Sequence, residues 1–68
     1  MKEKKQLQLD QFLKKMNLVA TGGQAKVIIQ KGDVKLNGVV ETRRKKKLQV
    51  GDVIEFSEKT WVVHSIII

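Results

Sequence analysis

The chain has 68 residues, with 14 Lys and Arg against 7 Asp and Glu, and a formal net charge of +7. Its length allows one domain at most, which buries about 60% of its unfolded surface, so we expect a single domain over residues 1–68 with a modest stability margin. The absence of cysteine excludes disulfides and thiolate metal sites. No signal peptide and no apolar run of membrane-spanning length is present, so we expect a cytoplasmic protein with no membrane partner.

The first predicted element is an amphipathic helix that follows a charged, non-periodic run over residues 1–6. That run predicts a frayed terminus ahead of a folded core over about residues 7–67. Asp10 near the start of the helix and the lysines at 14–15 near its end suit the helix dipole, and we expect the helix to end at Asn17. Its apolar stripe, at i, i+3, i+4 and i+7, consists of Leu9, Phe12, Leu13 and Met16.

A second helix is predicted to begin at Thr21. The Thr21 hydroxyl can accept a hydrogen bond from a first-turn N–H, and Gln24 can reach back in a capping box. Gly32 fits a left-handed C-terminal cap, and Lys31 lies in the last turn, where the dipole favours a cation. The apolar positions Ala25, Ile28 and Ile29 share the inner face. The outer face carries Gly22, Gly23, Lys26, Gln30 and Val27.

Strands fill the rest of the chain. Val34 to Asn37 alternates between apolar and polar residues, and Asn37-Gly38 is the preferred type I′ hairpin turn, so residues 39–40 should return beside it. Further strands are predicted over residues 53–56 and 61–67. Because residues 61–67 are apolar on both faces except His64 and Ser65, we expect this last strand to be central or covered on both sides. The predicted fold class is α+β, with two short N-terminal helices packed on a small, mostly antiparallel sheet.

Five consecutive cations follow the hairpin. Arg43, Arg44, Lys45, Lys46 and Lys47 cannot be core, because burying them would be very costly. Such a run is usually a solvated loop, but here it interrupts a compact domain in which mutual repulsion brings no structural benefit. We therefore favour a functional reason, namely a polyanionic partner.

No catalytic constellation is visible. His64 is the sole histidine, lies in an apolar stretch, and is assigned a structural role. The carboxylates are scattered and lack metal-ligand spacing. The run from Gly22 to Lys26 lacks the spacing of a phosphate-binding P-loop. The sequence therefore predicts a binding module that is not an enzyme and has no cofactor, no metal and no small-molecule substrate.

The start of the second helix is a candidate phosphate site. A helix N-terminus presents free N–H groups and the positive end of its dipole. Glycines at 22 and 23 leave those groups uncovered, and Lys26 adds a full charge one turn later. Alternatively, the glycines only permit a tight start to the helix, and these residues alone do not decide between the two interpretations.

If the polyanionic partner is a nucleic acid, the aromatic residues indicate which kind is bound. Only Phe12, Phe56 and Trp61 are present, and the first two fall on apolar faces, so no row of exposed rings offers bases a stacking surface. Cations, glycines, Thr21 and Asn37 suit phosphates and 2′-hydroxyls instead. This pattern favours structured RNA read through its backbone and shape, although charge alone does not separate RNA from DNA.

Two motifs resemble one known family. T-G-G-Q-A-K-x-x-I-x-x-G-x-V-x-L-N-G from Thr21, followed by K-L-x-V-G-D-V-I from Lys47, is similar to the RNA-binding domain named after small-subunit ribosomal protein four, here the S-four domain, which carries the alpha-L motif. The match covers about residues 9–56 and most resembles the stand-alone YaaA/YbcJ-like bacterial proteins. Many members have serine-arginine-serine at the helix start, whereas this chain has Thr21, Gly22 and Gly23. The phosphate contact of that arginine must therefore come from backbone, Lys26 or the basic loop.

The resemblance implies an RNA-binding module that engages ribosomal or transfer RNA, with a role on the ribosome or in its assembly, and we expect a monomer. Two alternatives stay open: an adaptor whose basic loop meets an acidic protein, and a domain that targets an enzyme encoded on a separate chain. The expected RNA-binding residues are Thr21, Gly22, Gly23, Gln24, Lys26, Lys31, Lys35, Asn37, Arg43, Arg44, Lys45, Lys46 and Lys47.

Overall fold

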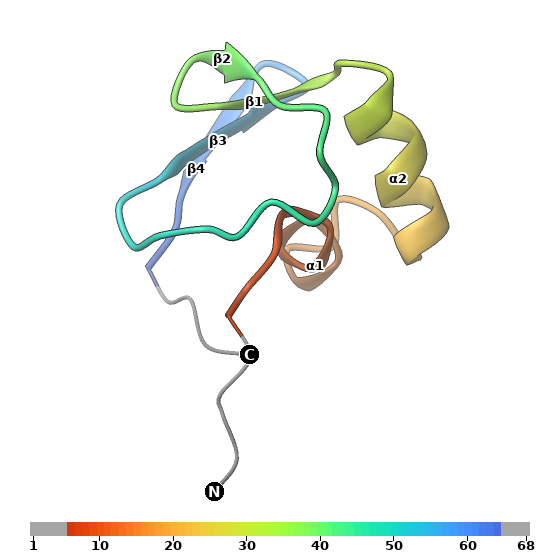
Figure 1. Ribbon diagram of the computed structural model, residues 1–68, viewed down its shortest axis with the longest axis horizontal. Helices are drawn as coiled ribbons and strands as arrows, with labels where there is room; N and C mark the ends of the chain where they lie inside the picture. The colour runs from red at the N-terminus through yellow and green to blue at the C-terminus, as the bar shows by residue number, and fades with distance from the viewer. Residues whose placement is uncertain (1–5, 65–68) are drawn as a thin grey trace, which may run out of the picture.

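Two helices precede four strands in the computed structural model, which describes residues 6–64 (Figure 1). The helices pack beside an open antiparallel sheet, so the predicted α+β class is confirmed. The elements are α1 (Leu9–Lys15), α2 (Gly22–Gln30), β1 (Val34–Leu36), β2 (Val39–Val40), β3 (Val53–Phe56) and β4 (Lys59–Val62).

The sheet has the order β2-β1-β3-β4, with every neighbouring pair antiparallel. Asn37 and Gly38 have φ angles of 53° and 85°, as the predicted type I′ turn between β1 and β2 requires. The long connection from residue 41 to residue 52 then carries the chain across so that β3 pairs on the other side of β1. This connection includes the basic run.

The last strand differs from its prediction. β4 lies at an edge of the sheet and ends at Val62, which is 46% exposed. His64 lies beyond the strand and is exposed, so it is not inside the last strand as predicted. Apolar residues on both faces of a strand do not show how many strands pair with it. The part of the predicted strand over residues 65–67 lies outside the described residues.

The N-terminal prediction is also partly outside the described chain, since only Gln6 of residues 1–6 is described. That residue is held in place: its Nε2 donates to the carbonyl of Leu48 over 2.7 Å. The hydrogen bond from the Leu48 N–H to the Leu7 carbonyl, 2.9 Å, continues the same contact. The ordered fold therefore begins at least one residue before the predicted core.

The core lies between the helices and one face of the sheet. Predicted core residues Leu9, Phe12, Leu13, Ala25 and Ile29 are all buried, whereas Met16 is 41% exposed and Ile28 is only half-buried. Met16 is exposed because α1 ends at Lys15 and the chain leaves helical geometry at residue 16. The strands and loops complete the core with Leu7, Val34, Leu48, Ile54 and Val63.

Phe12→Ala tests this core. Removing a ring that is 5% exposed should lower the free energy of unfolding by about 3–5 kcal/mol, much of the stability of so small a domain. The matched control is Val27→Ala, at a position on α2 that is 60% exposed, which should change it by less than about 0.5 kcal/mol. Urea unfolding followed by circular dichroism measures both. Equal midpoints for Phe12→Ala and wild type would refute the core assignment.

Candidate nucleic-acid interface

The side chains of Thr21 and Gln24 cap the N-terminus of α2. The Thr21 hydroxyl accepts from the Gln24 N–H over 3.1 Å, as predicted. The Gln24 Oε1 accepts from the N–H of Ala20 over 2.7 Å, one residue earlier than in the predicted capping box. The start of α2 is therefore fixed, and Gln24 retains its amide N–H groups as donors.

The N–H groups of Gly22 and Gly23 are open. Within residues 6–64, neither donates a hydrogen bond to a protein acceptor. A β carbon added at Gly22 would meet nothing within 4 Å, and one at Gly23 would meet only the Thr21 Oγ1, at 3.7 Å. Neither glycine has a positive φ. The fold therefore does not require glycine at either position, and alanine would favour the helix. This argues against the interpretation that the glycines serve only a tight helix start.

The N-terminus of α1, in contrast, is occupied. Its Leu9 and Asp10 N–H groups donate to the carbonyls of Lys46 (2.9 Å) and Arg44 (3.0 Å). The Gln11 N–H donates to the Asp10 Oδ1 over 2.8 Å. Of the two described helices, only α2 therefore offers first-turn N–H groups to a ligand.

These same hydrogen bonds hold the backbone of the basic loop against α1. The loop is attached to α1 by two backbone hydrogen bonds, and Lys47 forms a β-bridge with Gln8. Arg44 and Lys46 are half-buried, while Arg43, Lys45 and Lys47 are exposed. The loop thus presents its cations from a fixed backbone.

Two carboxylates that the sequence analysis did not assign to the site face this loop. Glu41 accepts from Arg43 three times: Nε and the backbone N–H reach Oε2 at 2.8 and 3.1 Å, and Nη2 reaches Oε1 at 3.3 Å. These hydrogen bonds hold the pKa of Glu41 below its usual range, and Glu41 in turn raises the pKa of Arg43. Asp10 lies 3.7 Å from the Arg44 Nε and 3.9 Å from the Lys45 Nζ.

Among residues 6–64, most of the remaining cations have no carboxylate partner, with Lys31 as an exception. Lys31 pairs with Asp33 at 3.2 Å. In the part of the chain from Gln6 to His64, no carboxylate oxygen lies within 4.0 Å of the ammonium groups of Lys14, Lys15, Lys26, Lys35, Lys46 or Lys47. Their charges remain available to a polyanion.

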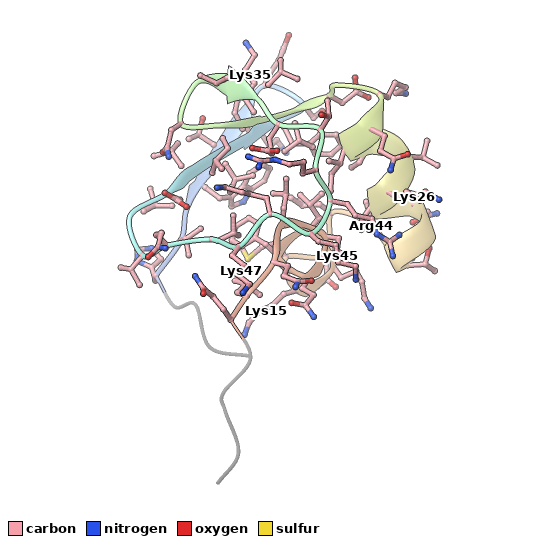
Figure 2. The ribbon with its side chains drawn as sticks, in the orientation of Figure 1. Lys15, Lys26, Lys35, Arg44, Lys45 and Lys47 are labelled. Atoms are coloured by element: carbon pink, nitrogen blue, oxygen red, sulfur yellow. The ribbon has the colours of Figure 1, made fainter. Side chains whose placement is uncertain are left out.

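The predicted site residues do not all fall in one place. Figure 2 draws Arg44 and Lys45 beside α1, on the side of the molecule that carries α2 and Lys26. Lys35 lies at the far end, next to the β1–β2 hairpin, on the face of the sheet opposite to the buried Val34. Lys31 lies at the other end of α2, about 15 Å from Thr21 by helix rise.

Asn37 has a structural partner. Its Nδ2 donates to the Asp52 Oδ1 over 3.1 Å, and its Oδ1 accepts from the Val53 N–H over 2.9 Å. Its amide thus joins the β1–β2 turn to the start of β3. The residues at the start of α2, together with Lys26, Arg44 and Lys45, lie on the α1–α2 side, whereas Lys47 lies on the side of α1 away from α2 (Figure 2).

Beside the start of α2 lies an open apolar hollow of about 380 Å³. It includes Phe56, which is half-buried rather than fully inside the core, and the side chain of Gln24. This hollow could not be predicted from the sequence, because its residues come from the α1–α2 link, α2 and β3. They are Leu18, Val19, Gln24, Val27, Ile28 and Phe56.

Within the described residues 6–64, no helix is long and apolar enough to cross a membrane. Over the same residues, no group of three His, Cys, Asp or Glu side chains could hold a metal ion.

Residues 2–64 match the family model of the S4 domain, the S-four domain named above. The chain belongs to the S4-domain family. The match takes in both helices, the basic loop and all four strands. Both the start of α2 and the basic loop therefore lie within the part of the chain that matches the family.

The chain is similar to two curated proteins. One is the "Probable ribosome maturation protein RlbA" of Bacillus subtilis (strain 168), with 43% identity over 47 residues, 69% of this chain. The chain spans 66% of that relative's length. The other is the "Putative RNA-binding protein YbcJ" of Escherichia coli (strain K12), with 37% identity over 51 residues, 75% of this chain and 73% of that protein.

A solved structure has the same fold. The solution structure of YbcJ from E. coli, described as having an alpha-L motif involved in RNA-binding, superimposes with a TM-score of 0.66 at 31% identity. The superposition covers 96% of this chain and 82% of that one. The predicted alpha-L motif is therefore confirmed as the architecture of this chain.

The Glu41–Arg43 contact predicts a pH dependence. Because the pKa of Glu41 is lowered in the folded state, the contact stabilises the fold above the unfolded pKa of Glu41 and is lost as the pH falls through the folded pKa. Glu41→Gln should therefore melt slightly below wild type at pH 7, a small effect as for exposed ion pairs, and the two should converge below about pH 4. Thermal melts from pH 7 to pH 3 measure this. In an Arg43→Gln background the difference at pH 7 should shrink, because only the backbone N–H of residue 43 still donates to Glu41; an undiminished difference would show that the Arg43 side chain is not its cause.

Proposed function

We propose that this protein is a non-enzymatic module that binds structured RNA, ribosomal or transfer RNA, through phosphates and shape. We further propose that it works in the cytoplasm, on the ribosome or in its assembly. The observation that carries the proposal is the pair of unpaired N–H groups at Gly22 and Gly23, at positions where the fold does not require glycine. Family membership and the printed names of the relatives support it.

A phosphate oxygen would bind at the start of α2. The N–H groups of Gly22 and Gly23 donate to it, and the helix dipole and the Lys26 ammonium group add positive potential. These donors replace the arginine that many relatives have at the helix start. Because backbone donors have a fixed direction, this contact sets the orientation of the RNA.

The basic loop supplies the second part of the interface. Lys46 and Lys47 have no carboxylate within 4.0 Å among residues 6–64, and Arg44 and Lys45 share one with each other. Cations on a fixed backbone neutralise neighbouring phosphates along a folded RNA and release counterions. With no exposed row of aromatic rings, this surface suits a duplex or a compact RNA better than a single strand.

Salt dependence tests the proposal. If about three to five phosphates are contacted, log K against log salt should fall with a slope of about −2 to −4. Fluorescence anisotropy with a labelled ribosomal RNA fragment measures the slope, and unlabelled competitors test specificity. Folded ribosomal or transfer RNA should compete better than a single-stranded homopolymer. Equal competition by heparin, double-stranded DNA and folded RNA would refute specific RNA recognition, and capture of acidic proteins without RNA would favour the adaptor.

Gly23→Glu tests the helix start. A carboxylate there would occupy the phosphate position, yet it suits the dipole and meets open space, so the fold should survive. Affinity for folded ribosomal RNA should fall more than affinity for the homopolymer, as measured by anisotropy. Gln30→Glu, at the other end of α2, makes the same charge change and should reduce both affinities alike. A folded Gly23→Glu protein whose two affinities match those of Gln30→Glu would remove the helix start from the interface.

A further inference from the structure

Among residues 6–64, Asp10 is the one charged residue that is buried, with 6% of its surface exposed. It lies in the first turn of α1, where the dipole favours a carboxylate. Its Oδ1 accepts from the Gln11 N–H over 2.8 Å, while its Oδ2 faces the Arg44 Nε at 3.7 Å and the Lys45 Nζ at 3.9 Å. A buried carboxylate is costly without such partners, so the position of Asp10 is linked to that of the loop.

Asp10 contacts the loop in two ways. Its N–H donates to the Arg44 carbonyl over 3.0 Å, which fixes the path of the backbone. Its Oδ2 is too far from both cations for a hydrogen bond, so it acts on them by charge attraction. The Arg44 side chain keeps 31% of its surface exposed and that of Lys45 keeps 63%, so both can still reach a phosphate.

We propose that Asp10 is a positioning residue that sets the selectivity of the interface by holding Arg44 and Lys45 in fixed places. This inference rests on the proposed function. Cations at fixed positions match only RNAs whose phosphates have the corresponding arrangement, whereas freely moving cations attract any polyanion. Asp10 also repels phosphate, so it reduces overall affinity while it increases selectivity.

Asp10→Asn tests the proposal, because asparagine keeps the Oδ1 acceptor for Gln11 and removes the charge. Asp33→Asn is the matched control, since Asp33 pairs with Lys31 at the far end of α2 and its removal makes the same change in net charge. The first readout is amide hydrogen exchange in the free protein. The Leu9 N–H, which donates to the Lys46 carbonyl, should exchange about tenfold faster in Asp10→Asn and unchanged in Asp33→Asn.

The second readout is selectivity, the ratio of affinities for a folded ribosomal RNA fragment and for single-stranded poly-uridine. Asp10→Asn should lower this ratio by about threefold, in the range expected for partly exposed ion pairs. Asp33→Asn should raise both affinities alike and leave the ratio unchanged. An Asp10→Asn protein that behaves like Asp33→Asn in both readouts overturns the proposal.

Arg44→Gln is a second variant, which removes one of the two cations that Asp10 faces and carries the test if Asp10→Asn does not fold. It should lower the ratio, whereas Lys35→Gln, which makes the same charge change at the far end of the molecule, should reduce both affinities alike. An Arg44→Gln protein whose ratio matches that of Lys35→Gln overturns the proposal. A wild-type protein that lacks selectivity overturns the proposed function as well, which separates the two failures.

Discussion

The attachment of the long connection between β2 and β3 to the N-terminal segment is the contact on which the rest of the structure depends. Three backbone hydrogen bonds make it: Leu48 to Leu7, Leu9 to Lys46, and Asp10 to Arg44, each 2.9–3.0 Å between nitrogen and oxygen. They lie in mostly buried surroundings, where an unpaired backbone group would be costly. They bring Leu7 and Leu48 together in the core, and they fix the positions at which the five consecutive cations project from the surface.

That contact also gives the two helices different roles. Two first-turn N–H groups of α1 donate to the loop and a third donates to the Asp10 side chain, so this helix supports the cations of the loop. The first turn of α2 is capped by Thr21 and Gln24, yet its two glycine N–H groups remain unpaired within the described residues. A rigid set of directional donors thus lies on the same side of the molecule as a set of positioned charges (Figure 2). In the proposed function the donors orient the RNA and the charges attract it.

Local signals in the sequence predicted the elements well. The Asn37-Gly38 turn, the Thr21 cap and the left-handed Gly32 each depend on residues next to one another in the chain, and all three are present. The attachment of the loop could not be predicted, because its acceptors are backbone carbonyls more than thirty residues away, which leave no trace in side-chain identity. The edge position of β4 was missed for a similar reason, since strand order depends on the long connection and not on the pattern within residues 59–62.

The candidate site shows the same difference between local signals, which the sequence contains, and contacts between distant segments, which it does not. Sequence identified the glycines and the cations, but only the structure separates Lys35, Lys31 and Asn37 from the group near α1 and α2 and adds Asp10 and Glu41 as partners of the loop. Side-chain type gives the chemistry of an interface, whereas its composition depends on how distant segments pack.

The central claim is that a phosphate binds the open N–H groups at the start of α2. Titrating ¹⁵N-labelled protein with a folded ribosomal RNA fragment, and following every amide signal by NMR, tests it most directly. Phosphate binding at this site should move the Gly22 and Gly23 amide protons downfield, as donors to an anion do, together with shifts in the loop 43–47. Shifts confined to the loop, with Gly22 and Gly23 unmoved at saturation, would contradict it.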